Sequence, residues 1–145
     1  MSSNLLDKSR VEIKLGGYGV APATALADAA LLPQVQDYRR GAGARMYPLD
    51  RNDIQQKIPT ADYHVSRKVD GEFPGLIYQN GEVVTLNPGG TVRVGMPWQD
   101  EAARLFAATN YQTAMVCGEL YLQQADRRER VHDVTSVVRQ PRSQE

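Results

Sequence analysis

The sequence predicts an α+β fold built on an antiparallel sheet, and three local patterns carry that prediction. Asn80-Gly81 joins two short runs rich in β-forming residues, and both turn residues tolerate the positive φ of a tight hairpin. A second turn signal, Asn87-Pro88-Gly89-Gly90, leads into a third such run. Apolar residues after Pro97 recur at helical spacing. Together these patterns predict a three-stranded meander over residues 75–95, followed by a helix.

Length and composition limit the chain to one ordinary domain. Its 145 residues, 41% of them apolar and 23% charged, can close a single hydrophobic core, which excludes the fibrous and disordered classes. Seventeen basic and 17 acidic residues give a formal net charge of zero, so no global positive field attracts nucleic acid or an anionic membrane. Any contact with a polyanion must therefore be local.

The cysteine count and the absence of long apolar runs bear on the compartment. Cys117 is the single cysteine, so no internal disulfide can form, which favours a reducing environment. The N-terminal residues mix charges and glycines with apolar residues and lack the apolar stretch of a signal peptide. No run of about eighteen apolar residues occurs. We therefore expect a cytoplasmic protein with no membrane partner.

Residues 1–60 are weakly patterned and are expected to form an N-terminal helical and loop segment. The alanine-rich run from Ala21 to Leu32, bracketed by two prolines, predicts one short helix. Residues 41–60 are rich in Gly, Pro, Asp and Asn, which predicts a loop with one helical turn around Ile54.

The run from residue 61 to residue 68 is expected to be extended and to precede the meander. Its alternation places His64, Ser66 and Lys68 on one face, and the run ends at an Asp70-Gly71 turn signal.

Three elements are predicted beyond the meander. The run WQDEAARLFAAT at residues 98–109 is an amphipathic helix. Residues 113–122 form a strand that places Glu119 among half-buried neighbours. A second helix begins near Asp133, and the last five residues, 141–145, are expected to be disordered.

The tetrapeptide Lys68-Val69-Asp70-Gly71 is the main candidate for chemistry, because it places a lysine beside an acidic residue and a tight turn. The pattern K-x-D-G arises by chance in on the order of one in thirty chains of this size. Its context is Glu119, a carboxylate inside an apolar strand, where a charged group is rare without a partner.

These two motifs together resemble those of a known superfamily. KVDGEF followed by CGELYL is similar to the first and third motifs of the covalent nucleotidyltransferases, which comprise DNA ligases, RNA ligases and mRNA capping enzymes. Motif order and spacing resemble the adenylation domain of ATP-dependent DNA ligases over roughly residues 45 to 140. The resemblance implies an antiparallel-sheet, ATP-grasp-like nucleotidyltransferase fold in which residues 61–145 form the first half of the domain.

The resemblance also implies a reaction. The amino group of Lys68 attacks the α-phosphate of ATP and forms lysyl-AMP, with Mg²⁺ neutralising the phosphates. A neutral amine is required, which desolvation or nearby positive charge from Arg67 or the metal would favour. Asp70 and Gly71 shape the turn that presents the lysine, and Glu119 contacts the ribose or helps to hold metal. Nicked duplex DNA is the implied partner, as in DNA repair and replication.

Several positions depart from the family pattern. Ser66 stands where a glutamate often reads the adenine amino group, and Phe73 replaces a common arginine. Asn87-Pro88-Gly89 replaces a Ser-Arg-Asn-like loop, so Arg93 is the nearest arginine for a nucleotide contact.

Later motifs of the family are missing, because Lys68 is the last lysine and no Asp-Gly follows Gly71. An OB-fold domain is expected to be absent as well, so DNA contacts would come through missing regions or a partner chain. The missing lysines would remove two cationic contacts to the triphosphate, each worth about 1.5–3 kcal/mol of binding free energy. We therefore expect the isolated chain to be nearly inactive as a ligase. A gene fragment, a truncated or split protein and a degenerate copy all remain open.

Alternative functions also remain open. They are an RNA ligase or capping-type enzyme, an NAD-dependent ligase, and a non-catalytic nucleotide-binding, DNA-binding or interaction fragment. Neither the two histidines, His64 and His132, nor Cys117 has the spacing of a zinc or nucleophile motif, so Cys117 is expected to be a packed thiol. The arginines at 127, 128 and 130 are interleaved with acidic residues, which favours a solvated loop.

Overall fold

The computed structural model describes residues 4–14, 17–58, 62, 64–123, 125, 127–128 and 130–139. Within them, an antiparallel sheet has the strand order β1-β2-β5-β4-β3-β6. Its strands are β1 (Glu12–Ile13), β2 (Gly19–Pro22), β3 (Gly75–Gln79), β4 (Glu82–Leu86), β5 (Thr91–Val94) and β6 (Thr113–Cys117). The α-helices are α1 (Leu31–Gly43), α2 (Ile54–Lys57), α3 (Pro97–Ala107) and α4 (Val131–Arg139). The predicted α+β class with an antiparallel sheet is therefore confirmed.

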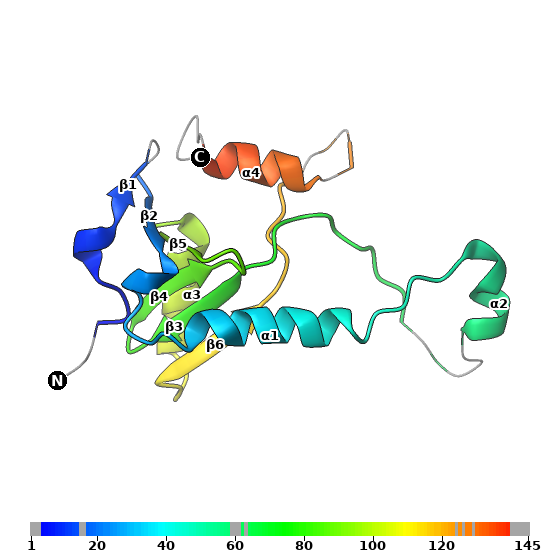
Figure 1. Cartoon of the computed structure of the whole chain (residues 1–145), viewed down its shortest axis with the longest axis horizontal. Coiled ribbons are helices and arrows are strands. Elements are labelled where there is room, and N and C mark those ends of the chain that lie inside the picture. Colours follow the sequence, from blue (N-terminus) through cyan, green and yellow to red (C-terminus); the bar gives the residue numbers. More distant parts are fainter. Residues whose placement is uncertain are drawn as a thin grey trace.

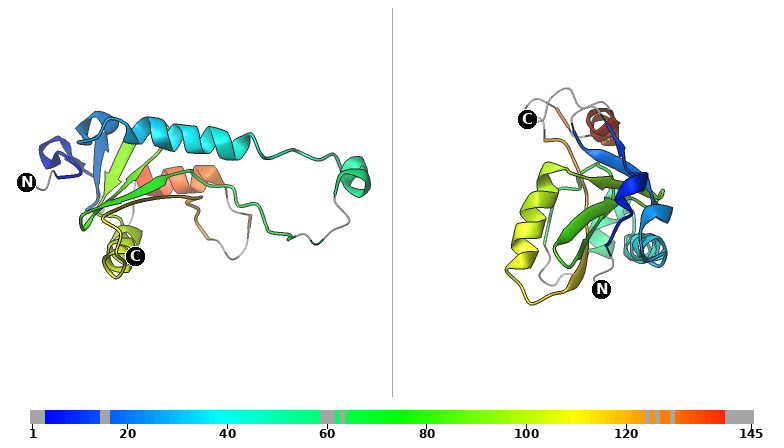
Figure 2. Two further views of the ribbon diagram at one scale, coloured as in Figure 1. Left: turned by 90° about the horizontal axis from the view of Figure 1, so that it is seen from below. Right: turned by 90° about the vertical axis from the view of Figure 1, so that its left-hand side faces the viewer.

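Helices cover both faces of the sheet. Helices α1 and α3 lie on opposite sides of it, as both views in Figure 2 show. Helix α1 runs beyond the sheet into a long excursion that carries the short helix α2 at its far end (Figure 1). The chain then returns to β3. We call this excursion the arm: its outgoing leg is residues 38–49, which include the end of α1, its far end is α2, and its returning leg leads from α2 to β3.

The predicted meander is confirmed as β3, β4 and β5. Asn80 and Gly81 have φ values of 48° and 91°, which is the left-handed region that a tight primed hairpin turn requires. At the next turn, the Asn87 side-chain oxygen accepts a hydrogen bond from the Thr91 amide at 2.9 Å. Turn chemistry thus sets the register of all three strands.

Alternation along the strands builds a core beneath α1. The α1-facing residues pack around Val35, which is fully buried; the main ones from the sheet are Ala21, Ile77, Val84, Leu86 and Val92. Gly75 allows the helix to approach, because a Cβ there would lie 2.6 Å from a methyl group of Val35.

Helix α3 is confirmed and is fixed to the opposite face by a buried side chain. Gln99 donates to the Thr85 hydroxyl at 3.2 Å and to the carbonyl of Arg93 at 2.7 Å, and it accepts from the Met96 amide at 3.0 Å. The Phe106 ring stacks on Tyr78 with centroids 5.0 Å apart. The helix therefore docks through both polar and aromatic contacts.

The predicted helix over Ala21–Leu32 is wrong. Ala21 and Pro22 belong to β2, which pairs with β5, and α1 begins only at Leu31. Pro33 lies in the first turn of α1, where its missing N–H would have no helical acceptor in any case. The helical turn around Ile54 is confirmed as α2.

Two predicted strands also need correction. Described residues 62 and 64–68 form no strand, and the strand expected over residues 113–122 ends at Cys117. Beyond Cys117 only an isolated bridge between Glu72 and Leu120 continues the pairing. The last helix is confirmed, beginning two residues before Asp133, whereas residues 141–145 lie outside the described residues. No helix in the described part of the chain has the length and apolar character needed to cross a bilayer.

Candidate functional site

Lys68 lies on the returning leg of the arm, in the segment between α2 and β3. The segment has no regular secondary structure, and the side chains of Ser66, Arg67 and Lys68 are exposed. Val69 and Asp70 are half-buried, so burial begins at the residue directly after the lysine. Desolvation was one of two effects expected to favour the neutral amine of Lys68. The exposed segment around Lys68 does not provide it.

The structure brings the two sequence motifs together. The amide of Gly71 donates to the Glu119 carboxylate at 2.9 Å. Glu72 and Leu120 exchange two backbone hydrogen bonds of 2.8 and 2.7 Å. The turn after Lys68 is thus attached directly to the segment that carries Glu119.

The close approach of these segments requires glycine at position 71. A Cβ built on Gly71 would collide with the backbone carbonyl of Leu120, which the bridge holds in place. The expected half-buried strand position of Glu119 is wrong, because β6 ends before it and its side chain is exposed. Its carboxylate reaches the motif through the amide of Gly71 instead.

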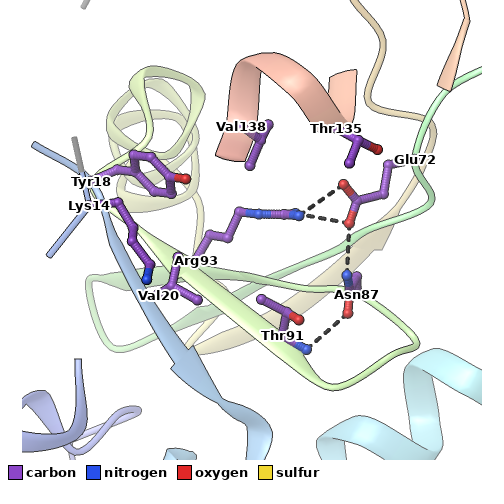
Figure 3. A pocket seen from close by; sticks show the side chains of 9 residues that line it. All are labelled: Lys14, Tyr18, Val20, Glu72, Asn87, Thr91, Arg93, Thr135 and Val138. Carbon is purple, nitrogen blue, oxygen red and sulfur yellow. Dashed lines mark hydrogen bonds and ion pairs between the residues drawn. The ribbon is translucent and has the colours of Figure 1, made fainter. Parts of the chain in front are cut away.

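Glu72 is the centre of a polar network on the sheet. Arg93 donates to both carboxylate oxygens of Glu72, at 2.9 and 3.0 Å, and Asn87 donates to one of them at 2.8 Å (Figure 3). The Arg93 and Glu72 side chains are only 10% and 16% exposed. Such a bidentate, largely desolvated pair fixes the orientation of both groups. Arg93, expected to contact a nucleotide, is therefore held by Glu72 in this structure.

A cavity of about 520 Å³ opens beside this network. Figure 3 shows α4 covering one side of it through Thr135 and Val138, while Lys14 and Tyr18 line it from the β1–β2 hairpin. The remaining lining residues are Val20, Glu72, Asn87, Thr91 and Arg93. The volume lies within the range of about 300–1,000 Å³ that is typical of small-molecule sites.

Sequence reasoning missed Glu72 and Asn87 as members of a site. A signal was present for Glu72, because it directly follows the Asp70-Gly71 turn and precedes an apolar strand. Asn87 is predicted as a turn residue and as part of the loop that replaces the Ser-Arg-Asn-like loop, but not as a partner of Glu72. In the structure its side-chain oxygen caps the turn and its amide nitrogen binds Glu72.

No group of three or more His, Cys, Asp or Glu side chains that could hold a metal ion occurs among the described residues. Glu119, the expected metal ligand, uses one carboxylate oxygen for the Gly71 amide. The described residues therefore do not build a metal centre of their own.

Comparisons of the chain with protein-family models, curated proteins and solved structures find no match.

Replacing Gly71 by alanine is expected to lower the free energy of unfolding by about 1–3 kcal/mol, as overpacking typically does. The added methyl group must push the Leu120 carbonyl away and so disturb the bridge to Glu72. Gly118→Ala is the matched control, because its Cβ meets nothing within 4 Å. Urea denaturation of both variants measures the difference, and equal stabilities would contradict the close approach.

Burial raises the pKa of the Cys117 thiol above its ordinary value. Alkylation requires the thiolate, so iodoacetamide at pH 8 should react more slowly with the folded chain than with the chain in urea. The two rates should become more similar as the pH rises through the pKa of Cys117 in the folded chain. A folded chain that reacts as fast as the unfolded one would contradict a packed thiol.

Proposed function

We propose that this chain carries out nucleotidyl transfer to Lys68, as the first step of an ATP-dependent, DNA ligase-like reaction. The neutral amine attacks the α-phosphorus of ATP, a P–N bond forms, and the bond to the bridging oxygen breaks. Pyrophosphate leaves with the bonding electrons, and the amine proton passes to solvent. One observation carries the proposal: the hydrogen bond from Gly71 to Glu119 joins the two motifs of this reaction.

The cavity beside Glu72 supports the proposal as a place for the nucleoside. Tyr18, Val20 and Val138 offer apolar surface, while Asn87 and Thr91 offer polar groups. Lys68 precedes Glu72 by four residues, and four extended residues span at most about 14 Å. This reach sets the largest distance from Glu72 that the phosphates of a nucleotide in the cavity would have to cover to meet the lysine.

Charge near the cavity is nearly balanced. Lys14 and Arg93 are cationic, but Lys14 pairs with Glu12 and Arg93 pairs with Glu72. No lysine follows Lys68 in the sequence to hold the phosphates. We therefore expect weak binding of ATP, and its bound magnesium ion would be held chiefly by the phosphates themselves, as is usual for Mg²⁺.

Incubation with α-labelled ATP and Mg²⁺ tests the proposal. A covalent adduct that is labile in acid, as a phosphoramidate is, supports lysine adenylation. Labelling with GTP in preference to ATP would favour a capping-type enzyme, and labelling with NAD alone would favour an NAD-dependent ligase. No adduct at saturating ATP would contradict nucleotidyl transfer.

A non-catalytic nucleotide-binding role is the second candidate. It is favoured by one observation, namely that Lys68 is exposed and is not among the residues that line the cavity. Binding of ATP without any covalent adduct distinguishes this role from the first.

A further inference from the structure

The outgoing leg of the arm has an unusual composition for a neutral chain. Residues 38–49, YRRGAGARMYPL, contain three arginines, two tyrosines and no acidic residue. The whole sequence has a formal net charge of zero, so this stretch concentrates positive charge locally. Because the chain as a whole is neutral, a polyanion can be attracted only by a local excess of positive charge, and this stretch provides one.

The side chains on this leg are open to solvent. Tyr38 is 57% exposed and Tyr47 is 81% exposed, although large aromatic rings usually gain from burial. Arg39 and Arg45 are exposed and form no ion pair within the described residues, while Arg40 pairs with Asp37 at the surface. An exposed pair of this kind is worth little and is screened by salt. The guanidinium groups are thus available to an external anion.

The outgoing leg contacts the segment that follows the proposed nucleophile. The ring of Tyr38 stacks on that of Phe73, with centroids 6.4 Å apart and an interplanar angle of 26°. Phe73 follows the KVDG motif directly after Glu72, so this contact joins the outgoing leg to the end of the returning leg. Both legs leave the sheet in the same direction, as Figure 2 shows.

We propose that residues 38–49 bind a single-stranded stretch of nucleic acid. Arginines follow the phosphate backbone, and exposed aromatic rings stack on unpaired bases, which is how proteins bind single strands without reading their sequence. The inference rests on the proposed function in one respect: the bound strand would be the acceptor that receives AMP from Lys68, and this acceptor would be a single strand rather than the nicked duplex that the resemblance implies.

Fluorescence anisotropy with a labelled, 5′-phosphorylated oligo-dT of about twenty nucleotides tests the surface. Tyr47→Ala should weaken binding about tenfold, since each stacked base contributes appreciably. Arg39→Gln with Arg45→Gln should reduce the slope of log K against log salt by about 1.4, because each lost phosphate contact removes about 0.7. Tyr111→Ala and Arg104→Gln, exposed residues elsewhere, are the matched controls and should change neither quantity.

Several results would overturn the inference. They are an absence of oligonucleotide binding, equal effects of the arm and control variants, and binding to blunt duplex in preference to the single strand. The Lys68→Ala variant should bind the oligonucleotide within about fourfold of the unmodified chain, because Lys68 lies outside residues 38–49 and can lose at most one phosphate contact. For the unmodified chain, strand binding without any adenylation would contradict the proposed function alone, whereas adenylation without strand binding would contradict this surface alone.

Discussion

Replacing Lys68 by alanine is expected to abolish formation of the AMP adduct, because the proposed reaction has no other nucleophile. The expected loss is complete rather than partial, since no P–N bond can form at this position. Lys68 is exposed, so the substitution should change the free energy of unfolding by less than about 0.5 kcal/mol. Intact mass and urea denaturation of the same preparation check both parts of the prediction.

Two matched variants sharpen this result. Lys57→Ala removes another exposed lysine of the arm, which pairs with Asp53 at 2.6 Å, and should leave the adduct unchanged. Lys68→Arg keeps the positive charge but cannot supply a neutral nucleophile, so it should be as inactive as Lys68→Ala. An adduct that persists in either Lys68 variant would show that another group is modified.

Replacing Arg93 by alanine should lower the free energy of unfolding by about 3 kcal/mol. Among the described residues, the substitution leaves the carboxylate of Glu72, which is 16% exposed, with the Asn87 amide as its one side-chain partner. Glu72 also forms the backbone bridge to Leu120, so the turn after Lys68 should loosen as well. Urea denaturation measures the loss of stability.

A double variant separates the lost charge pair from lost packing. Adding Glu72→Gln to Arg93→Ala removes the unpaired charge and should recover part of the stability, since a neutral amide is less costly to bury. A double variant less stable than Arg93→Ala, or a loss below about 1 kcal/mol for Arg93→Ala alone, would contradict a stabilising role for the pair.

Local sequence signals predicted the centre of the sheet well. Asn80-Gly81 adopts the positive φ values that its chemistry favours, and Pro97 begins the helix that follows the meander. These elements depend on turn and capping chemistry that neighbouring residues determine. They are therefore accessible without knowledge of tertiary contacts.

The N-terminal strands and the arm could not be predicted in this way. Strand β1 has only two residues, and β2 is stabilised by its pairing with β5 rather than by its own pattern. The alanine-rich run that includes Ala21 has high intrinsic helix propensity, but its first residues are paired in the sheet. Long-range pairing overrode local propensity there.

The sequence identified the two motifs of the candidate site but not the polar network around Glu72. The sequence singled out the two motifs that the hydrogen bond between Gly71 and Glu119 joins, whereas the pairing of Glu72 with Arg93 depends on the sheet register. Arg93 alternates with Val92 and Val94, which pack on the α1 side. Its own side chain consequently points to the opposite face, where Glu72 lies.

The central claim is that Lys68 accepts a nucleotidyl group, and intact-mass spectrometry of the chain tests it most directly. After incubation with saturating ATP and Mg²⁺, the unmodified chain should gain the mass of one AMP group. Peptide mapping should place the group on Lys68, and added pyrophosphate should remove it, because the reaction is reversible. An unchanged mass, or an AMP group on any other residue, would contradict the claim.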